Sequence, residues 1–471
     1  MNRKNIGLLL GPFLFCFVFF LEPFHGLNSE ANAVLASTLW IACWWLFESL
    51  PIAATALLPI VLLPLTGGAE IKQTTAAYGD KMLFLFVGGF IIAIAMQKWN
   101  LHKRIALSII SLVGSNAKYI VLGFMLATGL LSMWISNTAT TLMMVTIGVA
   151  LIKEIRELSQ ESANSFFKAL LLGIAFSASI GGVATLVGTP TNPIFVAVAK
   201  QLYGTEISFA SWMVFALPFS LLMLWLCWII LTRVTFPVNK IELPLGKEVL
   251  QKEYEKLGAM SAEEKAVGIV FILAALAWIT RSFLLNDIIP GINDTVIAIG
   301  AALLMFIIPS KNKAGNLLTW EEAERLPWGV IILFGGGLSL AAAFQSSGLA
   351  EWLGMQLVTV QFLPLFIIIL IIALAINFLT EVTSNVATAS IMLPVLASLA
   401  DAIGIDPYLL MIPATMAASC AFMLPIATGP NAIVFGSGEL EIKDMVKAGV
   451  WLNVISSFLI SLLVYFLLPS L

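Results

Sequence analysis

Residues 119–152 form a run of 34 positions without a charged side chain, and a Ser136-Asn137-Thr138 step stands at its middle. As a straight helix at 1.5 Å per residue, this run would be about 50 Å long. The hydrocarbon core of a bilayer is only about 30 Å thick. The run therefore has to fold back, either as two short spans or as a re-entrant hairpin that turns near the bilayer centre. Its second leg is rich in threonine and glycine, which suits burial against protein and favours the hairpin.

Composition places the whole chain in a membrane. Of its 471 residues, 60% are hydrophobic and only 11% are charged, whereas soluble domains carry about a quarter charged residues. The four cysteines lie apart in apolar segments and only two histidines are present, so no metal or disulfide framework is expected. No basic face indicates a nucleic-acid partner, and the lipid bilayer is the expected surrounding. The sequence predicts an all-α polytopic membrane protein, with apolar segments near 6–22, 33–49, 51–66, 82–97, 119–152, 169–199, 211–232, 266–284, 292–308, 329–347, 358–400, 407–436 and 448–469.

The positions of lysine and arginine orient these segments, because cytoplasmic loops are enriched in both residues. Arg3 and Lys4 place the N-terminus in the cytoplasm, and the lysine-rich residues 233–265 form a cytoplasmic linker between two halves. About eleven crossings follow, with the C-terminus external. Residues 1–32 are interpreted as a retained first transmembrane helix, although Ala31-Asn32-Ala33 is similar to a signal-cleavage site.

The polar step of the first run occurs twice. Residues 382–393 (VTSNVATASIML) repeat residues 134–145 (WISNTATTLMMV) at an offset of 248, and residues 332–345 repeat residues 84–97 at the same offset. Under the orientation above, the chain enters the first copy of the step from the cytoplasm and the second from outside, which predicts inverted-topology repeats. The predicted organisation is a first repeat, 33–232, with an inner re-entrant hairpin at 119–152, and a second repeat, 266–471, with an outer re-entrant hairpin at 358–400.

Glycine and proline interrupt one further apolar run in each half. Gly188-Thr189-Pro190-Thr191-Asn192, within 169–199, corresponds in kind to Ala427-Thr428-Gly429-Pro430-Asn431, within 407–436. Proline and glycine break helices, and an open backbone at membrane depth is tolerated only where it is buried in protein or faces a polar cavity. Both runs are therefore expected to be broken helices whose free ends share one site with the two hairpin turns.

The residue types at this shared site indicate which ligands it could bind. Half-helix N-termini attract anions, and exposed carbonyl, hydroxyl and amide oxygens suit a small hard cation such as sodium. Neither hairpin and neither break contains a lysine or an arginine. A multivalent anion is costly to bury without an opposite charge, so cations bound beside it would neutralise it. The residues therefore indicate cation-coupled anion transport.

The motifs SNTAT, GTPTN, TEVTSNVAT and AFMLPIATGPNAIVF make the chain resemble, over nearly its whole length, the divalent anion/sodium symporter family of INDY-type dicarboxylate and citrate carriers. The resemblance implies a homodimer in the cell's inner (plasma) membrane, in which a transport domain moves past a scaffold that includes residues 1–32, the elevator mechanism. It also implies sodium-coupled symport of C4-dicarboxylates such as succinate, malate and fumarate, with Na+ as the co-transported ion and no organic cofactor.

The same resemblance implies site residues position by position. The first sodium site matches Ser132, Ser136, Asn137 and Gly188, and the second matches Thr380, Thr383, Asn385 and Ala427. The substrate site matches Ser136, Asn137, Thr138, Thr189, Ser384, Asn385, Val386 and Thr428. Val386 can offer only its backbone N–H, and Gly429 stands where the commoner motif has a proline, which is expected to loosen that break.

Several functions stay open at this point. No sodium-site position is basic, which favours symport over the exchange found in some family members. The residues do not distinguish a dicarboxylate from citrate or sulfate. A proton-coupled antiporter of a related fold would use Glu381, the only acid within either hairpin, as its proton carrier. An enzyme is not expected, because no nucleophile stands with a base and an acid.

The predicted orientation can be tested by labelling. We expect a membrane-impermeant thiol reagent, applied to intact cells, to reach a cysteine in a C-terminal tag but not a cysteine placed in the 233–265 linker, because the two lie on opposite sides of the membrane. Permeabilised cells, in which both cysteines react, are the control. Labelling of the linker in intact cells would reverse the orientation and remove the basis for an inverted repeat.

Overall fold

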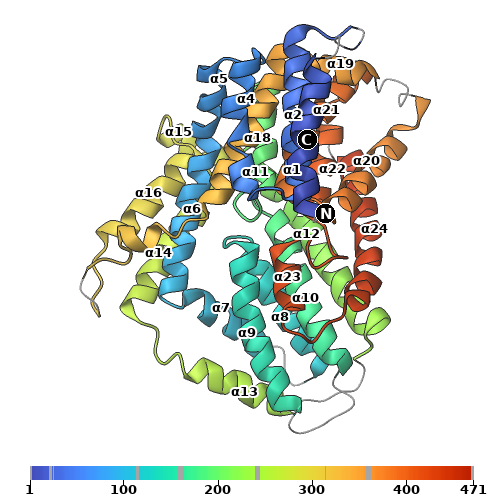
Figure 1. The fold of residues 1–471 in the computed structure, drawn as a ribbon. Coiled ribbons are helices and arrows are strands. Elements are labelled where there is room, and N and C mark those ends of the chain that lie inside the picture. Colours follow the sequence, from blue (N-terminus) through green and yellow to red (C-terminus); the bar gives the residue numbers. More distant parts are fainter. Residues whose placement is uncertain are drawn as a thin grey trace.

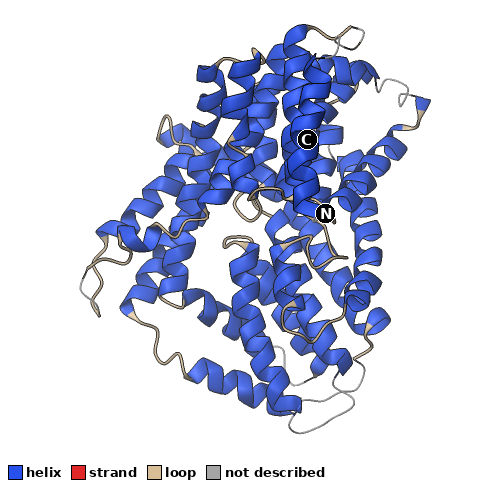
Figure 2. Ribbon diagram, viewed as in Figure 1, coloured by secondary structure: helices blue, strands red, loops and turns tan. Residues whose placement is uncertain are grey.

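The structure is a computed structural model that describes residues 3–20, 24, 26–112, 116–156, 164–238, 244–312, 315–356 and 362–467. Within these ranges every regular element is a helix (Figure 2). Eight helices are long and apolar enough to cross a membrane, and six shorter apolar helices accompany them. The prediction of an all-α polytopic membrane protein is confirmed, and the count of about eleven crossings stays a prediction.

The helices follow the predicted apolar segments closely, as their bounds show. In the first half they are α1 (Arg3–Phe20), α2 (Ser29–Phe47), α3 (Ile52–Thr55), α4 (Leu58–Thr66), α5 (Ile71–Ala76), the 3-10 turn η1 (Ala77–Gly79), α6 (Lys81–Lys98), α7 (Leu101–Ser111), α8 (Ala117–Ser132), α9 (Asn137–Arg156), α10 (Asn164–Val183), α11 (Thr191–Tyr203) and α12 (Phe209–Ile229), which the π-helical turn η2 (Ile230–Thr235) extends. The second half contains α13 (Pro244–Glu255), α14 (Ala262–Thr280), the π-helical turn η3 (Arg281–Leu285), α15 (Asn286–Ile288), α16 (Asp294–Ile307), α17 (Trp320–Ala323), α18 (Trp328–Ser347), α19 (Leu349–Gln356), α20 (Leu365–Thr380), α21 (Asn385–Ile403), α22 (Tyr408–Ala418), α23 (Gly429–Phe435) and α24 (Ile442–Leu467).

The two predicted hairpin segments, 119–152 and 358–400, fold as helical hairpins within the described residues. The first leg of each, α8 or α20, has 16 residues, about 24 Å at 1.5 Å per residue, which is shorter than the hydrocarbon core. The boundaries repeat at the offset of 248, because α8 ends at Ser132 and α20 at Thr380, while α9 begins at Asn137 and α21 at Asn385. Figure 1 shows α8 and α9 rising from the lower part of the molecule, while α20 and α21 reach its centre from above.

The two runs with glycine and proline are interrupted as expected. Helix α10 stops at Val183 before α11 begins at Thr191, and α22 stops at Ala418 before α23 begins at Gly429. One asparagine at the start of each second half-helix satisfies the carbonyls that the interruption frees. The Nδ2 atom of Asn192 donates to the carbonyls of Gly182, Val183 and Thr185, and the Nδ2 atom of Asn431 donates to those of Ala421 and Leu424.

One predicted segment and the predicted linker have different bounds in the structure. The segment at 51–66 divides into α3 and α4. The linker predicted at 233–265 is shorter, because η2 continues to Thr235 and α14 begins at Ala262, and it contains the helix α13. Residues 239–243 of that linker, residues 358–361 of the outer hairpin and the C-terminal residues 468–471 lie outside the described residues. The division into two repeats and a linker stays a prediction.

The end of the linker is fixed by a buried ion pair. Ser261 and Glu264 cap the start of α14 reciprocally, and the Glu264 carboxylate accepts two hydrogen bonds, at 2.9 and 3.1 Å, from the guanidinium of Arg104 on α7. Arg104 also donates to the carbonyl of Gly258 at 3.0 Å. These contacts attach α7, which precedes the first hairpin, to the beginning of the second half.

Helix α10 packs against α8, α9, α12 and α23, and nearly all of its side chains from Phe166 to Val183 are buried. Its close approach to α8 depends on two facing glycines. A Cβ atom added to Gly181 would lie 2.2 Å from the carbonyl oxygen of Gly129 and 2.6 Å from its Cα. The first hairpin is thereby packed backbone to backbone against the broken helix.

We expect Gly181→Ala to lower the melting temperature, because α8 and α10 would have to separate, and overpacking costs about 1–3 kcal/mol. Gly300→Ala, in α16, is the matched control. Nothing lies within 4 Å of an added Cβ atom there, so this change should be neutral or stabilise the helix by roughly 0.5–1 kcal/mol. Thermal unfolding of both variants in the same detergent measures the difference. Equal melting temperatures would contradict the close packing of α8 on α10.

Candidate functional site

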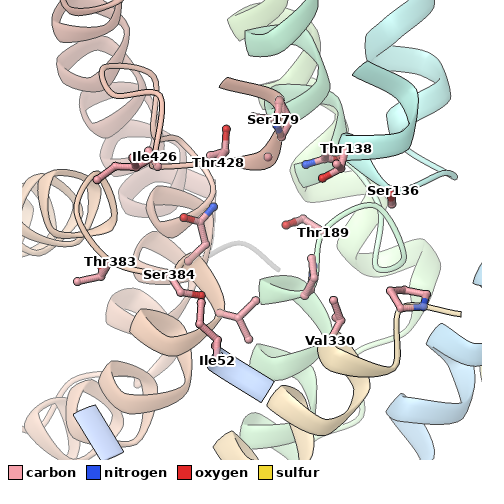
Figure 3. A pocket seen from close by; sticks show the side chains of 18 of the residues that line it. Ile52, Ser136, Thr138, Ser179, Thr189, Val330, Thr383, Ser384, Ile426 and Thr428 are labelled. Atoms are coloured by element: carbon pink, nitrogen blue, oxygen red, sulfur yellow. The ribbon is translucent and has the colours of Figure 1, made fainter. Parts of the chain in front are cut away.

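A central cavity of about 830 Å³ brings together polar residues from both halves of the chain. Figure 3 shows Ser136 and Thr138 on one side of it, Thr383 and Ser384 on the other, and Thr189 and Thr428 between them. Side chains from the rest of the fold, such as Ile52 and Val330, form a further wall. All eight residues predicted for the substrate site line the cavity, namely Ser136, Asn137, Thr138, Thr189, Ser384, Asn385, Val386 and Thr428.

The turn of the first hairpin places Ser132, the last residue of α8, against Asn137, the first residue of α9. Ser132 Oγ donates to the carbonyl oxygen of Ala178 at 2.8 Å and lies 2.5 Å from the side-chain amide of Asn137. With the amide nitrogen turned toward these oxygens, Asn137 Nδ2 donates to Ser132 Oγ and, at 3.2 Å each, to the carbonyls of Ala178 and Gly188. Three oxygens from three segments thus surround one side-chain atom.

These groups are of the kind that bind a small hard cation. When the Asn137 amide is turned by half a turn, Oδ1 takes the place of Nδ2, and all the polar atoms that meet at this point are oxygens. Gly188 is fixed as glycine, because an added Cβ atom would lie 2.4 Å from the carbonyl oxygen of Gly182. Ser136, the fourth residue predicted for the first sodium site, stands on the turn and accepts the N–H of Ala139 at 3.2 Å. The structure therefore gathers all four predicted residues at the first turn.

The turn of the second hairpin repeats this arrangement with a different hydroxyl residue. Thr380 Oγ1 lies 2.5 Å from Asn385 Oδ1 and 3.1 Å from the carbonyl oxygen of Ala418. Thr383 lines the cavity, and its hydroxyl bonds the carbonyl oxygen of Leu379 at 2.8 Å. Three of the predicted second sodium residues, Thr380, Thr383 and Asn385, therefore lie at one turn, although the Thr383 hydroxyl is already hydrogen-bonded. Ala427 lies on the second break, beside Thr428, and lines the same cavity.

Glu381 holds the second break to the second hairpin. Its side chain is 3% exposed, and its carboxylate accepts the backbone N–H groups of Phe422, Met423 and Leu424 at 2.7–2.9 Å, together with Asn453 Nδ2 at 2.7 Å. A proton on this carboxyl would turn an acceptor into a donor that faces other donors. The geometry therefore gives Glu381 a positioning role as a carboxylate and speaks against a proton carrier.

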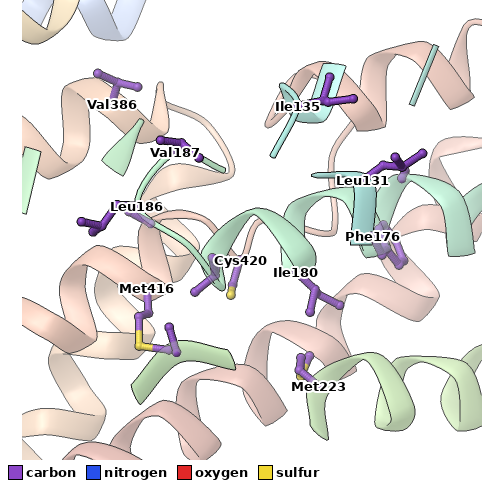
Figure 4. Packing of buried hydrophobic residues seen from close by; sticks show 14 of the residues in the cluster. Leu131, Ile135, Phe176, Ile180, Leu186, Val187, Met223, Val386, Met416 and Cys420 are labelled. Carbon is purple, nitrogen blue, oxygen red and sulfur yellow. The ribbon is translucent and has the colours of Figure 1, made fainter. Parts of the chain in front are cut away.

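Apolar side chains pack around both breaks. Leu186 on the first break, Cys420 on the second, and Met416 and Ile180 on the helices that precede them are fully buried (Figure 4). Buried polar backbone groups are costly in such surroundings, which explains why Asn192, Asn431 and Glu381 stand at the breaks.

Thr138 and Gly429 lie in close contact across the two halves. A Cβ atom added to Gly429 would lie 2.4 Å from Thr138 Oγ1. The sequence-based expectation that this glycine loosens the break is therefore incomplete. The missing side chain makes room for the threonine of the opposite hairpin.

The sequence analysis did not identify three polar or charged residues that line this cavity, Lys4, Glu48 and Ser179. Of the described residues around it, Lys4 is the only basic one and Glu48 the only acidic one. Glu48 has a φ angle of 49°, which residues other than glycine rarely adopt. Ser179, on α10, is 2% exposed, and its hydroxyl has no partner among the described residues. No motif marked these positions, because each reaches the cavity only through the packing of distant segments.

Comparisons with known proteins show the family to which the chain belongs. Residues 2–468 match the family described as the sodium:sulfate symporter transmembrane region. The protein named sodium-dependent dicarboxylate transporter SdcS from Staphylococcus saprophyticus is 47% identical over 473 residues, which cover 98% of this chain and 91% of the relative. The protein of the same name from Staphylococcus aureus (strain bovine RF122 / ET3-1) is 48% identical over 474 residues, with the same coverage.

Solved structures show the same fold at low sequence identity. The YdaH transporter of Alcanivorax borkumensis gives a TM-score of 0.63 at 16% identity and covers 99% of both chains. MtrF of Neisseria gonorrhoeae gives a TM-score of 0.61 at 11% identity, over 98% of this chain and 94% of its own. The extent of the family match and the identity to full-length transporters show that the chain belongs to the sodium:sulfate symporter family of membrane transporters.

Proposed function

We propose that this protein is a secondary active transporter that couples the movement of sodium to the uptake of C4-dicarboxylates such as succinate, malate and fumarate. The observation that carries the proposal is the position of Asn137 and Asn385. Each stands at a hairpin turn, contacts an oxygen-rich shell on one side and lines the central cavity on the other. The relatives named as sodium-dependent dicarboxylate transporters support the choice of ion and substrate.

The charges around the cavity explain why transport would need a cation. The turns and breaks contribute hydroxyls, amides and backbone groups, and Lys4 is the only basic residue among the described ones that line the cavity. One lysine does not neutralise a dianion, and an unneutralised dianion is costly to bury. Two sodium ions, one at each turn, would balance its charge, and they would bind beside it.

Related substrates and cycles fit the same cavity less well. Sulfate occurs in the family description, and citrate fits the chemistry of the site, but the names of the two relatives from Staphylococcus favour dicarboxylates. An exchanger would be expected to replace sodium by a basic side chain, and none of the residues at the two turns is basic. A proton-coupled antiporter would need a free acid, which Glu381 does not provide.

The proposal also includes the oligomeric state, the orientation in the membrane and the mode of movement. The protein would work as a homodimer in the plasma membrane, with its N-terminus in the cytoplasm and its C-terminus outside. Transport would follow an elevator mechanism, in which the hairpins and broken helices move against the wall formed by α1–α3, α6 and α18. The cavity lies between these two sets of elements, which supports this division.

Uptake of labelled succinate into proteoliposomes tests the function directly. We expect an inward sodium gradient to drive accumulation, and replacement of sodium by potassium or choline to abolish it, because the two cation positions are then empty. Unlabelled fumarate and malate should compete, and vesicles without protein are the control. Accumulation driven by a pH gradient in sodium-free buffer would contradict the proposal and would favour a proton-coupled antiporter.

Asn137→Ala and Asn385→Ala test the proposed double role of the turns. Each should raise both the half-saturating sodium concentration and the KM for succinate roughly tenfold or more, because a hydrogen bond or ligand to a charged group is lost. Asn293→Ala is a matched control, since Asn293 caps α16 away from the central cavity. A change in the KM for succinate with an unchanged sodium requirement would show that the turns bind substrate alone.

A further inference from the structure

Ser179 is a buried donor that no group in the described part of the chain satisfies. It lies in the last turn of α10, lines the central cavity and is only 2% exposed. Its hydroxyl has no hydrogen-bond partner among the described residues. Figure 3 shows it beside Thr428 and Thr138, at the end of the cavity where the first hairpin meets the second break. A buried hydroxyl without a partner is unfavourable, so its position there needs a reason.

The other half of the protein shows how such a hydroxyl is normally satisfied. Ser419 follows Ala418, whose carbonyl accepts from Thr380, just as Ser179 follows Ala178, whose carbonyl accepts from Ser132. Ser419 is also 2% exposed. Its hydroxyl lies 2.7 Å from Thr191 Oγ1, so the two hydroxyls bond each other across the halves.

The residue that would satisfy Ser179 in the same way is a proline. Asn192 and Asn431 play the same part in the two breaks, so the residues before them, Thr191 and Pro430, correspond. Pro430 has no hydroxyl. The exchange of threonine for proline leaves Ser179 without the partner that Ser419 has, and its donor faces the cavity.

The hydrogen of the Ser179 hydroxyl lacks an acceptor, and a carboxylate and a sodium ion differ in whether they can provide one. A sodium ion can bind the oxygen of a hydroxyl but leaves its hydrogen without an acceptor, whereas a carboxylate takes that hydrogen. Thr428 stands at the same end, and its Oγ1 already accepts the N–H of Asn431 at 3.2 Å, so its own hydrogen is directed elsewhere. Two hydroxyl hydrogens are therefore available at one end of the cavity.

We propose that the Ser179 hydroxyl donates a hydrogen bond to one carboxylate group of the bound dicarboxylate, at the end of the cavity formed by Thr138 and Thr428. This inference rests on the proposed function. The corresponding hydroxyl at the other end, Ser419, is used within the protein. The site therefore binds the two ends of its substrate differently, although the fold repeats around it.

The first test replaces the donor. In sodium-driven succinate uptake by proteoliposomes, Ser179→Ala should raise KM roughly tenfold with little change in kcat, since a hydrogen bond to a charged acceptor is worth about ten- to a hundredfold in affinity. The half-saturating sodium concentration should stay within about twofold of the unmodified protein. Ser177→Ala is the matched control, because Ser177, on the same helix, donates to the carbonyl oxygen of Gly173 at 2.5 Å and does not line the cavity.

A second variant introduces a hydroxyl that could pair with Ser179. Pro430→Thr should also raise KM, because the new hydroxyl would engage Ser179 as Thr191 engages Ser419. In the Ser179→Ala background it should have little further effect, and this non-additivity distinguishes the pair from two independent disturbances. Melting temperatures in detergent identify any variant that fails to fold.

The results would distinguish a failure of this inference from a failure of the proposed function. Sodium-driven uptake by the unmodified protein, with an unchanged KM in Ser179→Ala, would overturn this inference alone. A shift in the sodium requirement without a shift in the KM for succinate would assign Ser179 to the cation and overturn it as well. Absence of sodium-driven succinate uptake by the unmodified protein would overturn the proposed function and the inference with it.

Discussion

The central cavity depends on two interruptions of a helix inside an apolar body. Each interruption frees backbone groups that an intact helix would pair, and each unpaired group costs several kcal/mol where water is excluded. Asn192 and Asn431 satisfy the freed carbonyls, and the Glu381 carboxylate satisfies three consecutive N–H groups. Without these side chains α10 and α22 could not end where they do, and the hairpin turns would face continuous helices.

The satisfied breaks in turn position the hairpins. The carbonyls of Ala178 and Ala418, close to the ends of α10 and α22, accept hydrogen bonds from the last hydroxyl residues of α8 and α20. Ser132 and Thr380 then contact the asparagines that begin α9 and α21. One chain of hydrogen bonds in each half thus connects the break to the turn, and the cation positions proposed above lie within these two chains.

Much of this arrangement could be predicted from the sequence, because polar residues are rare in this chain. The Ser136-Asn137 and Ser384-Asn385 steps stand in long apolar runs whose only charged residue is Glu381, so their spacing of 248 located both hairpins, and glycine and proline located both breaks. Lys4, Glu48 and Ser179 could not be found in this way. Serine is common in membrane helices, and only the packing of α10 between both halves places Ser179 at the cavity. The Arg104–Glu264 pair escaped for the same reason, since the two residues are 160 positions apart.

The two halves agree where the backbone requires it and differ where the cavity allows it. Two pairs that satisfy main-chain groups are retained in kind, Asn192 with Asn431 and Ser132 with Thr380. Glu381 is the exception, because it satisfies three backbone N–H groups and its counterpart is Met133. The other pairs that differ lie in the hairpin turns and the breaks, where Thr138 corresponds to Val386, Pro190 to Gly429 and Thr191 to Pro430.

This distribution has a physical cause. A lost main-chain partner would weaken the fold in either half, whereas a changed side chain on the cavity wall alters only what the cavity can bind. Gly429 gives room to Thr138, and Pro430 has no hydroxyl that could pair with Ser179, whose own hydroxyl has no partner among the described residues. Both differences fall at the same end of the cavity, where they increase the number of polar groups that face its interior. A fold with repeated backbone geometry can in this way present a site whose two ends are chemically unequal.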